Sequence, residues 1–517
     1  MITIDSALKK GLPKDTKSLC PECKKVVPAT IYESDGKVLM DKICPEHGKV
    51  TVIYWSDVEL YLKAEKFAYD TTGVSNALIQ DATSCPENCG LCNLHTSHTV
   101  LANLDLTNRC NMNCPICFAN ANQAGYVYEP TFEEVVKMLE TLRAEKPVPC
   151  TAIQFSGGEP TIYPRFFDVI KKAKELKFAQ IQVATNGVKL ASDPEFAIKC
   201  AEAGLNTIYL QFDGLDDDIY MRSRGRKMMD VKNKAIENIR NVPNKRPSVV
   251  LVPTLVRGLN DHQIGDIIRF AIKNMDVVRG VNFQPVAFTG RMEQEEREKG
   301  RYTIPDLVKD IEEQTGYAHK KDWYPVPSVV PISAYASAFL GKDKVTFSAH
   351  PHCGLATYWF VKDENNVIPI TDFIEVEGLF DDLFELAKKT ENSKVKKLSL
   401  LKAEKIIKKH MIEDKIPDGM NTMQFIKMMT NVFNNETKEG LAKFSWNMLL
   451  VSAMHFQDDY NYDVERVKRC VIHYVVPDGR IIPFCAYNGG PEYRAGVEKE
   501  FSVPLDEWRA KQGNEYT

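Results

Sequence analysis

The 517-residue sequence lacks several features that would place it in a membrane or on a nucleic acid. No apolar run approaches the roughly 18–20 residues that cross a bilayer, and the first residues, from Met1 to Ser6, show no secretory signal. The net charge of −4 and the pI near 6.3 are unlike the clustered basic surface of a nucleic-acid-binding protein. Tandem repeats are also absent. We therefore expect a cytoplasmic protein without a nucleic-acid partner, and peripheral contact with the inner membrane face stays open.

Cysteine, in contrast, is abundant, with 14 residues in the chain. In a reducing compartment, clustered cysteines indicate metal binding rather than disulfide bonds. Cys150 and Cys200 stand apart from the others, and we interpret both as small buried apolar side chains. The other twelve cysteines are the candidates for metal ligands.

The middle of the chain alternates strand-like and helix-like patterns. Apolar strand-like runs occupy residues 101–107, 151–156, 180–186, 207–213, 248–255 and 281–287. Amphipathic helical patterns lie between them, for example over 131–145 and 165–177. Six successive βα units predict a parallel sheet, either open or curled into a barrel, with the active site at the carboxyl ends of its strands.

The flanking regions differ from this core. Residues 1–99 are rich in cysteine and predict short strands around small metal-binding knuckles. Residues 301–517 begin with largely helical patterns, up to about residue 460, and end in strands and turns with a hairpin at Pro477-Asp478-Gly479. The sequence thus predicts an α/β protein with three units: 1–99, a central barrel at 100–300, and 301–517.

A cysteine triplet directly follows the first strand of the βα series. Its spacing is Cys110-x3-Cys114-x2-Cys117. Iron–sulfur clusters are usually held by four thiolates, so three leave one iron open to a small chelator such as the amino and carboxylate groups of S-adenosylmethionine (SAM). The alternative is a structural zinc knuckle, which closes with a fourth ligand.

Three further motifs end the next strands and favour the cluster. They are Gly157-Gly158-Glu159-Pro160, then Thr185-Asn186-Gly187, then Asp213-Gly214. Glycine permits a close approach to the backbone, and the carboxylate of Glu159 can accept an ammonium group. Their order along a parallel sheet places all of them at one edge.

This combination of motifs resembles the radical SAM superfamily over about residues 100–290. The resemblance implies a partial (β/α)6 barrel in which Cys110, Cys114 and Cys117 hold a [4Fe–4S] cluster. It also implies that Gly157, Gly158, Glu159 and Pro160 receive the amino end of SAM, and that Thr185, Asn186 and Asp213 lie near its carboxylate and ribose. The family usually has an aromatic residue before the third cysteine; here Ile116 precedes it and Phe118 follows, so the neighbour of the adenine is undecided.

An N-terminal pair of knuckles predicts a mononuclear metal site. Cys20-x2-Cys23 and Cys44-x2-His47 supply three thiolates and one imidazole. This donor set fits tetrahedral zinc or a rubredoxin-like iron. If His47 is only a turn residue, the fourth ligand comes from elsewhere.

The remaining cysteines predict one or two auxiliary [4Fe–4S] clusters. Cys85-x3-Cys89-x2-Cys92 copies the spacing of the first triplet, but no strand-end motifs follow it, and we prefer an auxiliary cluster to a zinc site there. Cys353, Cys470 and Cys485 lie beyond the barrel. They are candidates for a second auxiliary cluster, or one of them completes the first, which makes 301–517 a helical and auxiliary-cluster region.

Over its whole length the chain resembles the archaeal tetraether lipid synthases. The shared stretches are the CPEHG knuckle at Cys44, the CPENCGLC segment at Cys85 and the HYVVPDGRIIPFC stretch from His473 to Cys485. The resemblance implies C–C coupling of the terminal isoprenoid carbons of two chains of an archaeal diether phospholipid, with 5′-deoxyadenosyl radicals, an alkyl intermediate held on an auxiliary cluster, and a low-potential electron donor such as ferredoxin. The methionine- and phenylalanine-rich stretch 411–454 is then an apolar channel or plain helical core.

Two other functions stay open. The same group resemblance allows a radical SAM methylase of 7,8-dihydro-6-hydroxymethylpterin, which needs a pterin pocket and no long apolar tunnel. A non-enzymatic iron–sulfur carrier or zinc scaffold would bind no SAM, and the GGEP and TNG motifs argue against it.

Overall fold

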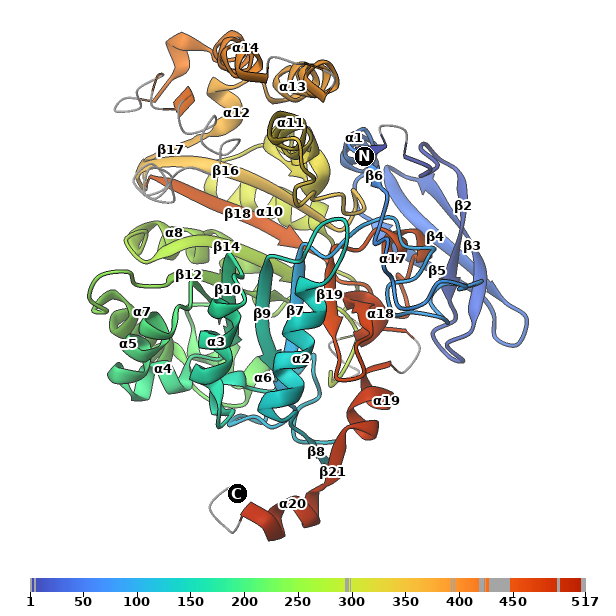
Figure 1. Ribbon diagram of the computed structural model, residues 1–517, viewed down its shortest axis with the longest axis vertical. Helices are drawn as coiled ribbons and strands as arrows, with labels where there is room; N and C mark the ends of the chain where they lie inside the picture. The colour runs from blue at the N-terminus through green and yellow to red at the C-terminus, as the bar shows by residue number, and fades with distance from the viewer. Residues whose placement is uncertain are drawn as a thin grey trace.

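The computed structural model describes most of the chain, namely residues 6–292, 299–391, 396–417, 447–490 and 493–512, with residues 2, 3, 297, 393, 423, 425 and 426. A small antiparallel sheet lies at the N-terminal end, beside a large, mostly parallel sheet with helices around it. A layer of helices lies beyond one edge of the large sheet (Figure 1).

The N-terminal sheet is antiparallel and has the strand order β2-β3-β4-β5. Its strands are β2 (Lys14–Leu19), β3 (Val26–Ser34), β4 (Lys37–Cys44) and β5 (Gly48–Trp55). Asp35 and Gly36 connect β3 to β4 with positive φ angles of 51° and 73°, as the twist of a two-residue hairpin demands. Every second residue of β4 is buried, so one face packs against the rest of the molecule. The predicted short strands of the first unit are confirmed.

All six strands predicted for the centre of the chain are present and pair in parallel with their neighbours. They are β7 (Leu101–Thr107), β9 (Ala152–Gly157), β10 (Gln180–Thr185), β11 (Thr207–Gln211), β12 (Ser248–Val252) and β14 (Val278–Pro285). A short continuation, β13 (Thr254–Leu255), also pairs with β14. The carboxyl ends of these strands therefore meet at one edge of the sheet, where the candidate motifs lie.

Strands from the last third of the chain extend the sheet on both sides. β18 (Met448–Met454) pairs in parallel with β14, and β19 (Ile472–Val475) pairs in parallel with β7. Antiparallel strands complete the edges: β15 (Tyr324–Pro325), β16 (Gly354–Asp363), β17 (Asn366–Pro369) and β20 (Ile481–Pro483). The three-unit division stays a prediction, and the sheet itself runs across residue 300.

The sequence-based expectation of a largely helical region up to residue 460 is wrong for β16 and β18. Both strands are short apolar runs, and periodicity alone does not separate such runs from buried helix. The hairpin predicted at Pro477-Asp478-Gly479 is confirmed, because it joins β19 to β20.

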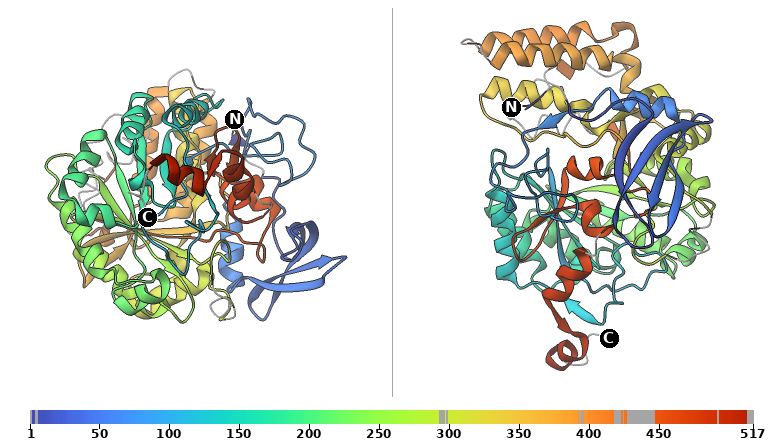
Figure 2. Two further views of the ribbon diagram at one scale, coloured as in Figure 1. Left: turned by 90° about the horizontal axis from the view of Figure 1, so that it is seen from below. Right: turned by 90° about the vertical axis from the view of Figure 1, so that its right-hand side faces the viewer.

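Helices lie on the outer side of the curved sheet (Figure 2). They are α2 (Phe132–Arg143), α3 (Phe166–Glu175), α4 (Val188–Ser192), α5 (Pro194–Ala203), α6 (Asp217–Arg224), α7 (Met229–Arg240), α8 (Ile264–Lys273) and α10 (Ile304–Thr315). The helices predicted over 131–145 and 165–177 are thus confirmed. Thr131 begins α2 with a capping box, in which its hydroxyl accepts from the Glu134 N–H while the Glu134 carboxylate accepts from the Thr131 N–H.

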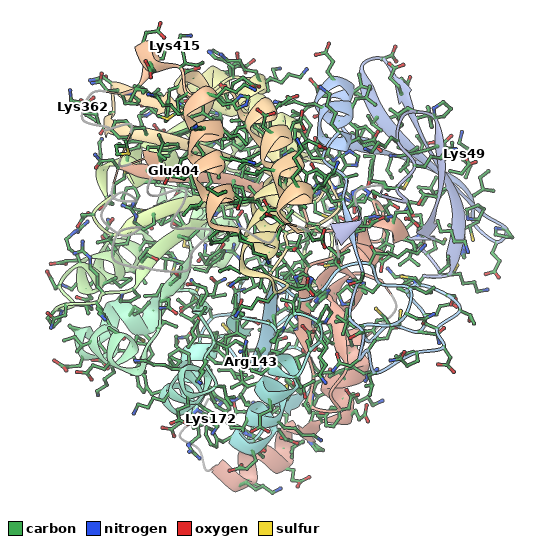
Figure 3. The ribbon with its side chains drawn as sticks, turned by 45° about the horizontal axis from the view of Figure 1, so that its top comes forward. Lys49, Arg143, Lys172, Lys362, Glu404 and Lys415 are labelled. Atoms are coloured by element: carbon green, nitrogen blue, oxygen red, sulfur yellow. The ribbon has the colours of Figure 1, made fainter. Side chains whose placement is uncertain are left out.

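The helical layer beyond β16 has an apolar core of its own, built around Tyr335, Phe373 and Leu383. It contains α11 (Val330–Leu340), α12 (Ile370–Phe373), α13 (Val376–Glu391) and α14 (Lys396–Lys409). Glu404 of α14 lies on this layer, and Lys362 lies at the end of the neighbouring β16 (Figure 3). In the part of the chain that the structure describes, no helix is long and apolar enough to cross a membrane. Most of the stretch considered as an apolar channel, including Phe433, Phe444 and Trp446, falls outside the described residues.

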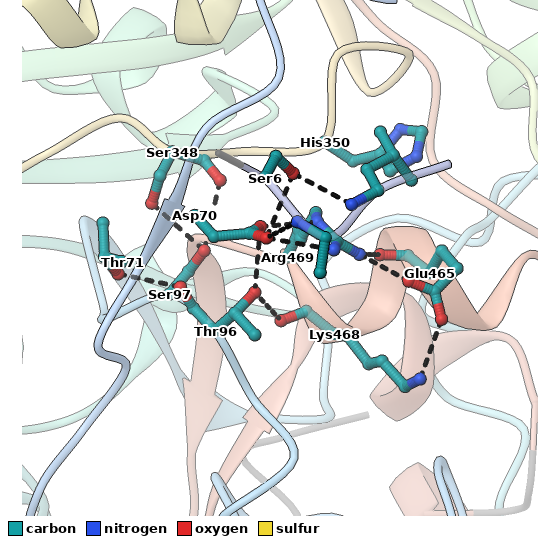
Figure 4. Close-up of polar contacts among 12 residues, drawn as sticks. Ser6, Asp70, Thr71, Thr96, Ser97, Ser348, His350, Glu465, Lys468 and Arg469 are labelled. Carbon is teal, nitrogen blue, oxygen red and sulfur yellow. Dashed lines mark hydrogen bonds and ion pairs between the residues drawn. The ribbon is translucent and has the colours of Figure 1, made fainter. Parts of the chain in front are cut away.

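The C-terminal segment returns to the first barrel strand and to the N-terminal region. It forms α17 (Val464–Lys468), α18 (Phe484–Asn488), α19 (Tyr493–Glu500), β21 (Ser502–Pro504) and α20 (Leu505–Gln512). Buried Arg469 joins the two ends of the chain: its Nε donates to Asp70 Oδ1 at 2.7 Å and its Nη1 donates to Glu465 Oε2 at 2.6 Å (Figure 4). β21 also pairs with β8 (Tyr126–Tyr128), which follows the cysteine triplet.

Candidate active site and metal centres

The loop that carries the cysteine triplet, residues 108–118, lies against the turn after β9. The Gly158 N–H donates to Thr107 O at 2.7 Å, and the Glu159 N–H donates to Arg109 O at 2.9 Å. A Cβ on Gly157 would lie 2.2 Å from Thr107 O, and one on Gly158 would lie 2.2 Å from Arg109 O. Both positions therefore require glycine because two backbones touch there. These glycines, which the sequence led us to expect as points of ligand approach, first of all let the two loops join.

Glu159 connects its own Gly157-Gly158-Glu159-Pro160 motif to the Thr185-Asn186-Gly187 motif. Its Oε1 accepts from the hydroxyls of Thr161 at 2.6 Å and Thr185 at 2.8 Å, and its Oε2 accepts from the Asn186 N–H at 2.9 Å. Burial raises the pKa of this carboxyl above its ordinary value, while these donors oppose the shift. Oε2 holds this single protein hydrogen bond among the described residues and keeps acceptor capacity for a further donor.

Asp213 is buried and held by Arg224. The two groups form a bidentate pair, with Nε–Oδ2 at 2.5 Å and Nη2–Oδ1 at 2.9 Å. Burial lowers the pKa of Arg224, but Asp213 more than compensates, so the guanidinium stays charged. Arg224, which no sequence motif marked, also donates to Ile116 O at 2.9 Å. Arg224 lines a cavity at the carboxyl ends of the strands, whereas Asp213 lies outside its lining. Asp213 therefore positions Arg224.

A second missed residue is Lys232 on α7. Its buried Nζ donates to Asn186 O at 2.6 Å and to Gln211 Oε1 at 2.8 Å. Burial lowers its pKa to about 7. Lys232 thereby holds the ends of β10 and β11 together, and both acceptor residues line the cavity.

A cavity of about 320 Å³ lies at the carboxyl ends of the strands. From the predicted set it brings together Cys110, Cys114, Cys117, Phe118, Gly157, Gly158, Glu159, Thr185 and Asn186. Pro160 is buried at the start of a short 3-10 turn (Pro160–Ile162) and, like Asp213, lies outside the lining. The order of the motifs along the sheet is therefore confirmed as a spatial cluster.

The inner side chains of the strands add a row of amides to a cavity whose lining is otherwise mostly apolar. Gln182 Nε2 donates to Gln154 Oε1 at 2.9 Å, and Gln154 Nε2 donates to Asn103 Oδ1 at 2.8 Å, so one amide row crosses three strands. Asn282 and Gln284 add further amides from β14. A site with so many fixed donors and acceptors suits a ligand with hydrogen-bonding edges.

Aromatic rings form one wall of the cavity. Phe118 stacks on Phe484 with ring centroids 5.5 Å apart, and Phe456 also stacks on Phe484, with centroids 3.9 Å apart. Tyr474 lies 5.3 Å from Phe484. Ile116 instead packs in a small buried cluster away from the cavity. Phe118, after the third cysteine, therefore faces the site, and Ile116, before it, does not.

Arg494, from the C-terminal helix α19, closes this wall. Its Nη1 donates to Asp105 Oδ2 of β7 at 2.7 Å, and its Nε and Nη2 donate to Asn488 Oδ1 at 2.9 and 2.7 Å. Its guanidinium also lies over the rings of Tyr474 and Tyr487. Burial lowers its pKa, but Asp105 and these groups raise it well above the ordinary value. No sequence motif marks Arg494, since its partner Asp105 lies 389 residues away along the chain.

The N-terminal knuckles form a compact metal site. The ligand atoms of Cys20, Cys23, Cys44 and His47 all lie within 4.8 Å of one another. His47 Nδ1 is 3.6 Å from Cys20 Sγ and 3.5 Å from Cys44 Sγ. Three thiolates and an imidazole at such separations fit one tetrahedral zinc ion, so His47 belongs to the site and is not only a turn residue.

The other cysteines gather in two neighbouring groups. Cys85 and Cys89 share a buried cluster with Cys470 and Cys485. Burial raises the pKa of the Cys89 thiol, and the neighbouring thiols of Cys85, Cys92 and Cys470 raise it further. The pKa of Cys485 rises to about 11 through burial, which Arg466 opposes and Cys353 adds to. Cys150 and Cys200 are buried in the apolar core, as predicted.

Comparison with known proteins finds two families that match parts of the chain. Residues 104–271 match the radical SAM superfamily, and residues 12–56 match the HMPTM N-terminal zinc ribbon domain. The GTP 3′,8-cyclase of Clostridium acetobutylicum is 24% identical over 40% of this chain and 61% of its own. The structure of Streptococcus suis SuiB bound to S-adenosylmethionine covers 43% of this chain and 48% of its own, with 18% identity and a TM-score of 0.33.

The fold and its sites define a radical SAM enzyme that uses a [4Fe–4S] cluster and SAM and carries an N-terminal zinc ribbon. The 7,8-dihydro-6-hydroxymethylpterin dimethyltransferase of Methanocaldococcus jannaschii is 48% identical over 96% of this chain and 97% of its own length. The chain therefore belongs to the family of that dimethyltransferase.

This relationship corrects the resemblance to tetraether lipid synthases, and with it the diether phospholipid substrate, the C–C coupling of isoprenoid chains and the suggested membrane contact. The stretches that carried the resemblance lie mostly away from the cavity: the CPEHG knuckle belongs to the zinc ribbon, and of the HYVVPDGRIIPFC stretch only Tyr474 and Phe484 line the cavity. Motifs that build metal sites and packing do not report the substrate.

Proposed function

We propose that this protein is a radical SAM methyltransferase that adds methyl groups to carbon in 7,8-dihydro-6-hydroxymethylpterin. The observation that carries the proposal is the 48% identity to the dimethyltransferase along almost the whole of both chains. Identity of this extent includes the zinc ribbon, the barrel and the C-terminal wall of the cavity, so it is not confined to the cofactor-binding core.

The chemistry of the cavity supports this substrate. A pterin is a flat bicyclic ring whose amino-oxo edge carries N–H donors and carbonyl and ring-nitrogen acceptors. Asn103, Gln154 and Gln284 offer amides that meet both kinds of group. Phe118 and Phe484 offer aromatic faces for stacking. A cavity of about 320 Å³ also suits a compact ring better than a long isoprenoid chain.

We assign the cofactor roles to the strand-end residues. Cys110, Cys114 and Cys117 are the ligands of the cluster, and the free capacity of Glu159 Oε2 suits the ammonium group of SAM. When bound, the cluster and SAM supply a carbon-centred radical. The described residues hold SAM in place: Glu159 is fixed by Thr185 and Asn186, and Arg224 is fixed by Asp213.

We also propose auxiliary [4Fe–4S] sites at Cys85, Cys89 and Cys92, and at Cys353, Cys470 and Cys485. The thiols fit such a role because they are half-buried or buried, and because the positive Arg466 faces Cys353 and Cys485. Burial lowers the pKa of Arg466, but these thiols and Tyr54 raise it above its ordinary value. A fixed cation of this kind offsets the negative charge of thiolate ligands.

The test is an anaerobic reaction of the iron-reconstituted enzyme with a low-potential reductant, the pterin and SAM whose methyl group carries deuterium. We expect 5′-deoxyadenosine together with pterin that has gained one or two CH2 units, detected by mass spectrometry. Deuterium in the product identifies SAM as the methyl source. A parallel reaction with an added folate-bound one-carbon donor tests the other source, which would give a methylated product without deuterium. Cys114→Ala is the control and should form neither product. Deoxyadenosine with unchanged pterin would contradict the proposal, as would conversion of a diether phospholipid in a parallel reaction.

A further inference from the structure

Amide side chains on the inner face of the sheet already use their oxygens within the protein. Asn103 Oδ1 accepts from Gln154 Nε2 at 2.8 Å, and Gln154 Oε1 accepts from Gln182 Nε2 at 2.9 Å. On β14, which is not a neighbour of β7 in the sheet, Asn282 Oδ1 accepts from Ser452 Oγ at 3.0 Å. A primary amide has one acceptor oxygen and two N–H donors. Asn103 and Asn282 therefore keep the donors of Nδ2, while their oxygens are engaged.

The two Nδ2 atoms face the central cavity of about 320 Å³. Asn103 is 1% exposed and Asn282 is 6% exposed, and both residues line this cavity. Neither Nδ2 has a hydrogen-bond partner among the residues that the structure describes, and neither is fully enclosed by them. The small exposed fraction of each side chain therefore includes an amide nitrogen that a ligand in the cavity can reach.

The register of the sheet fixes the direction of these amides. Asn103 lies directly opposite Gln154 on the neighbouring strand, and Asn282 lies directly opposite Ser452. Each asparagine thus lies beside the residue that holds its oxygen. Turning the Asn103 amide over would place its Nδ2 against Gln154 Nε2, one donor against another. The donors of Asn103 are therefore kept toward the cavity.

We propose that Asn103 and Asn282 are specificity-determining residues that bind the acceptor edge of a pterin, formed by its 4-oxo group and its ring nitrogen N5. In this way they select the 7,8-dihydro oxidation state over the 5,6,7,8-tetrahydro state. The inference rests on the proposed function and deepens it, because it names the atoms that distinguish the substrate from its reduced form.

The two oxidation states differ at the ring nitrogen that lies next to the 4-oxo group. In a 7,8-dihydropterin N5 is an imine nitrogen with a lone pair and no hydrogen, so this edge carries two acceptors. In a tetrahydropterin N5 carries a hydrogen, which would meet the N–H of an asparagine. A buried donor left without an acceptor costs free energy. Gln284 lines the same cavity, and its amide oxygen can accept from the ring N–H groups of either form.

The test compares the dissociation constants of 6-hydroxymethyl-7,8-dihydropterin and its 5,6,7,8-tetrahydro form on the anaerobic holoenzyme, without reductant. Wild type should bind the dihydro form about tenfold more tightly, which corresponds to one unsatisfied hydrogen bond in a buried site. Asn103→Asp and Asn282→Asp replace the donor by an acceptor but keep the oxygen that Gln154 or Ser452 binds. Each should reduce the preference about tenfold, and Asn103→Ala, which only removes the donor, should bring it close to one.

The matched control is Asn365→Asp, in the exposed turn between β16 and β17 and outside the cavity. It should keep the wild-type preference, and all variants should keep most of their affinity for SAM. A preference that the Asp variants leave unchanged would come from ring shape and would refute the inference. So would equal loss of SAM and pterin affinity, or wild-type protein that binds both pterins alike. In these three cases methylation of the dihydropterin by the wild type still upholds the methyltransferase proposal, whereas a wild type that neither binds nor methylates it refutes both.

Discussion

The zinc knuckle and the cysteine loop after β7 are both short cysteine motifs, but they are built in different ways. The zinc ligands all come from one antiparallel sheet, within 28 residues, and their atoms already lie within 4.8 Å of one another. The cysteine loop depends on distant strands: Gly158 and Glu159 hold its backbone, and Arg224 holds Ile116. The first site is local and the second is assembled by the fold. A substitution at the zinc site should therefore affect mainly the ribbon, and one at the cysteine loop should involve the strands that hold the loop.

The largest expected effect is on the local site. Cys44→Ser should abolish zinc binding, and structural zinc contributes about 10–16 kcal/mol of folding free energy in small zinc domains. We expect loss of hydrogen-exchange protection in β3 to β5, while β7 to β14 stay protected. Cys200→Ser, in the buried core of α5, is the control and should keep the zinc. Loss of protection across the barrel would show that the ribbon is not an independent unit.

Asp213→Asn should lower the free energy of unfolding by disturbing the site that the fold assembles around the cysteine loop. It leaves the buried Arg224 without its carboxylate, and breaking a buried pair in this way costs about 3–5 kcal/mol of unfolding free energy. Asp276→Asn removes the partner of Arg240 in a half-exposed pair and should cost at most about 1 kcal/mol. Denaturant unfolding of the anaerobic holoenzyme measures both. Equal losses from the two variants would refute the positioning role of Asp213.

Gly158→Ala should change the position of the cysteine loop and so lower the reaction rate. Its Cβ would collide with Arg109 O, so the cysteine loop must move. Displacing a site by about 1 Å can cost on the order of 100-fold in rate, and we expect such a loss in 5′-deoxyadenosine formation. Gly496→Ala in α19 meets no atom within 4 Å and should instead stabilise its helix by about 0.5–1 kcal/mol. Near wild-type rates for Gly158→Ala would mean that the two loops are not coupled.

The last expected effect lies outside both sites and is seen only as a change of stability with pH. Burial raises the pKa of Glu145 to about 8, so between pH 4.5 and 8 the folded state binds more protons than the unfolded state. Stability should therefore fall as pH rises through this window and level off above it. Glu145→Gln should flatten that dependence, while Glu140→Gln on the exposed face of α2 should not. Thermal unfolding midpoints from pH 5 to 8 test the difference, and parallel curves for wild type and Glu145→Gln would contradict it.

The same contrast explains what the sequence predicted and what it did not. Strands β7 to β14 and the order of the strand-end motifs were predictable, because alternating βα patterns and parallel pairing are repeated over short distances. Arg224, Lys232 and Arg494 were missed, since each acts through partners that only the fold brings near. β16 and β18 were missed because periodicity alone does not separate short apolar strands from buried helix.

The substrate was misassigned for a related reason. The stretch around Cys44 belongs to the zinc ribbon, and those around Cys85 and Cys485 pack in one buried cluster. Proteins with different substrates can share such features. The residues that face the cavity, such as Asn103, Gln154 and Asn282, are isolated amides on separate strands. Only their convergence at the centre of the sheet makes them a polar pocket, and no linear motif records that.

The pairing of β19 with β7 has a consequence for biogenesis. β7 is formed by residues 101–107, but one of its two neighbours is completed only when residues 472–475 emerge. Until then β7 presents an open strand edge, which can pair with other chains and promote aggregation. Contacts of such large sequence separation also form slowly. Truncation before Ile472 should therefore yield an aggregation-prone chain rather than a smaller working barrel.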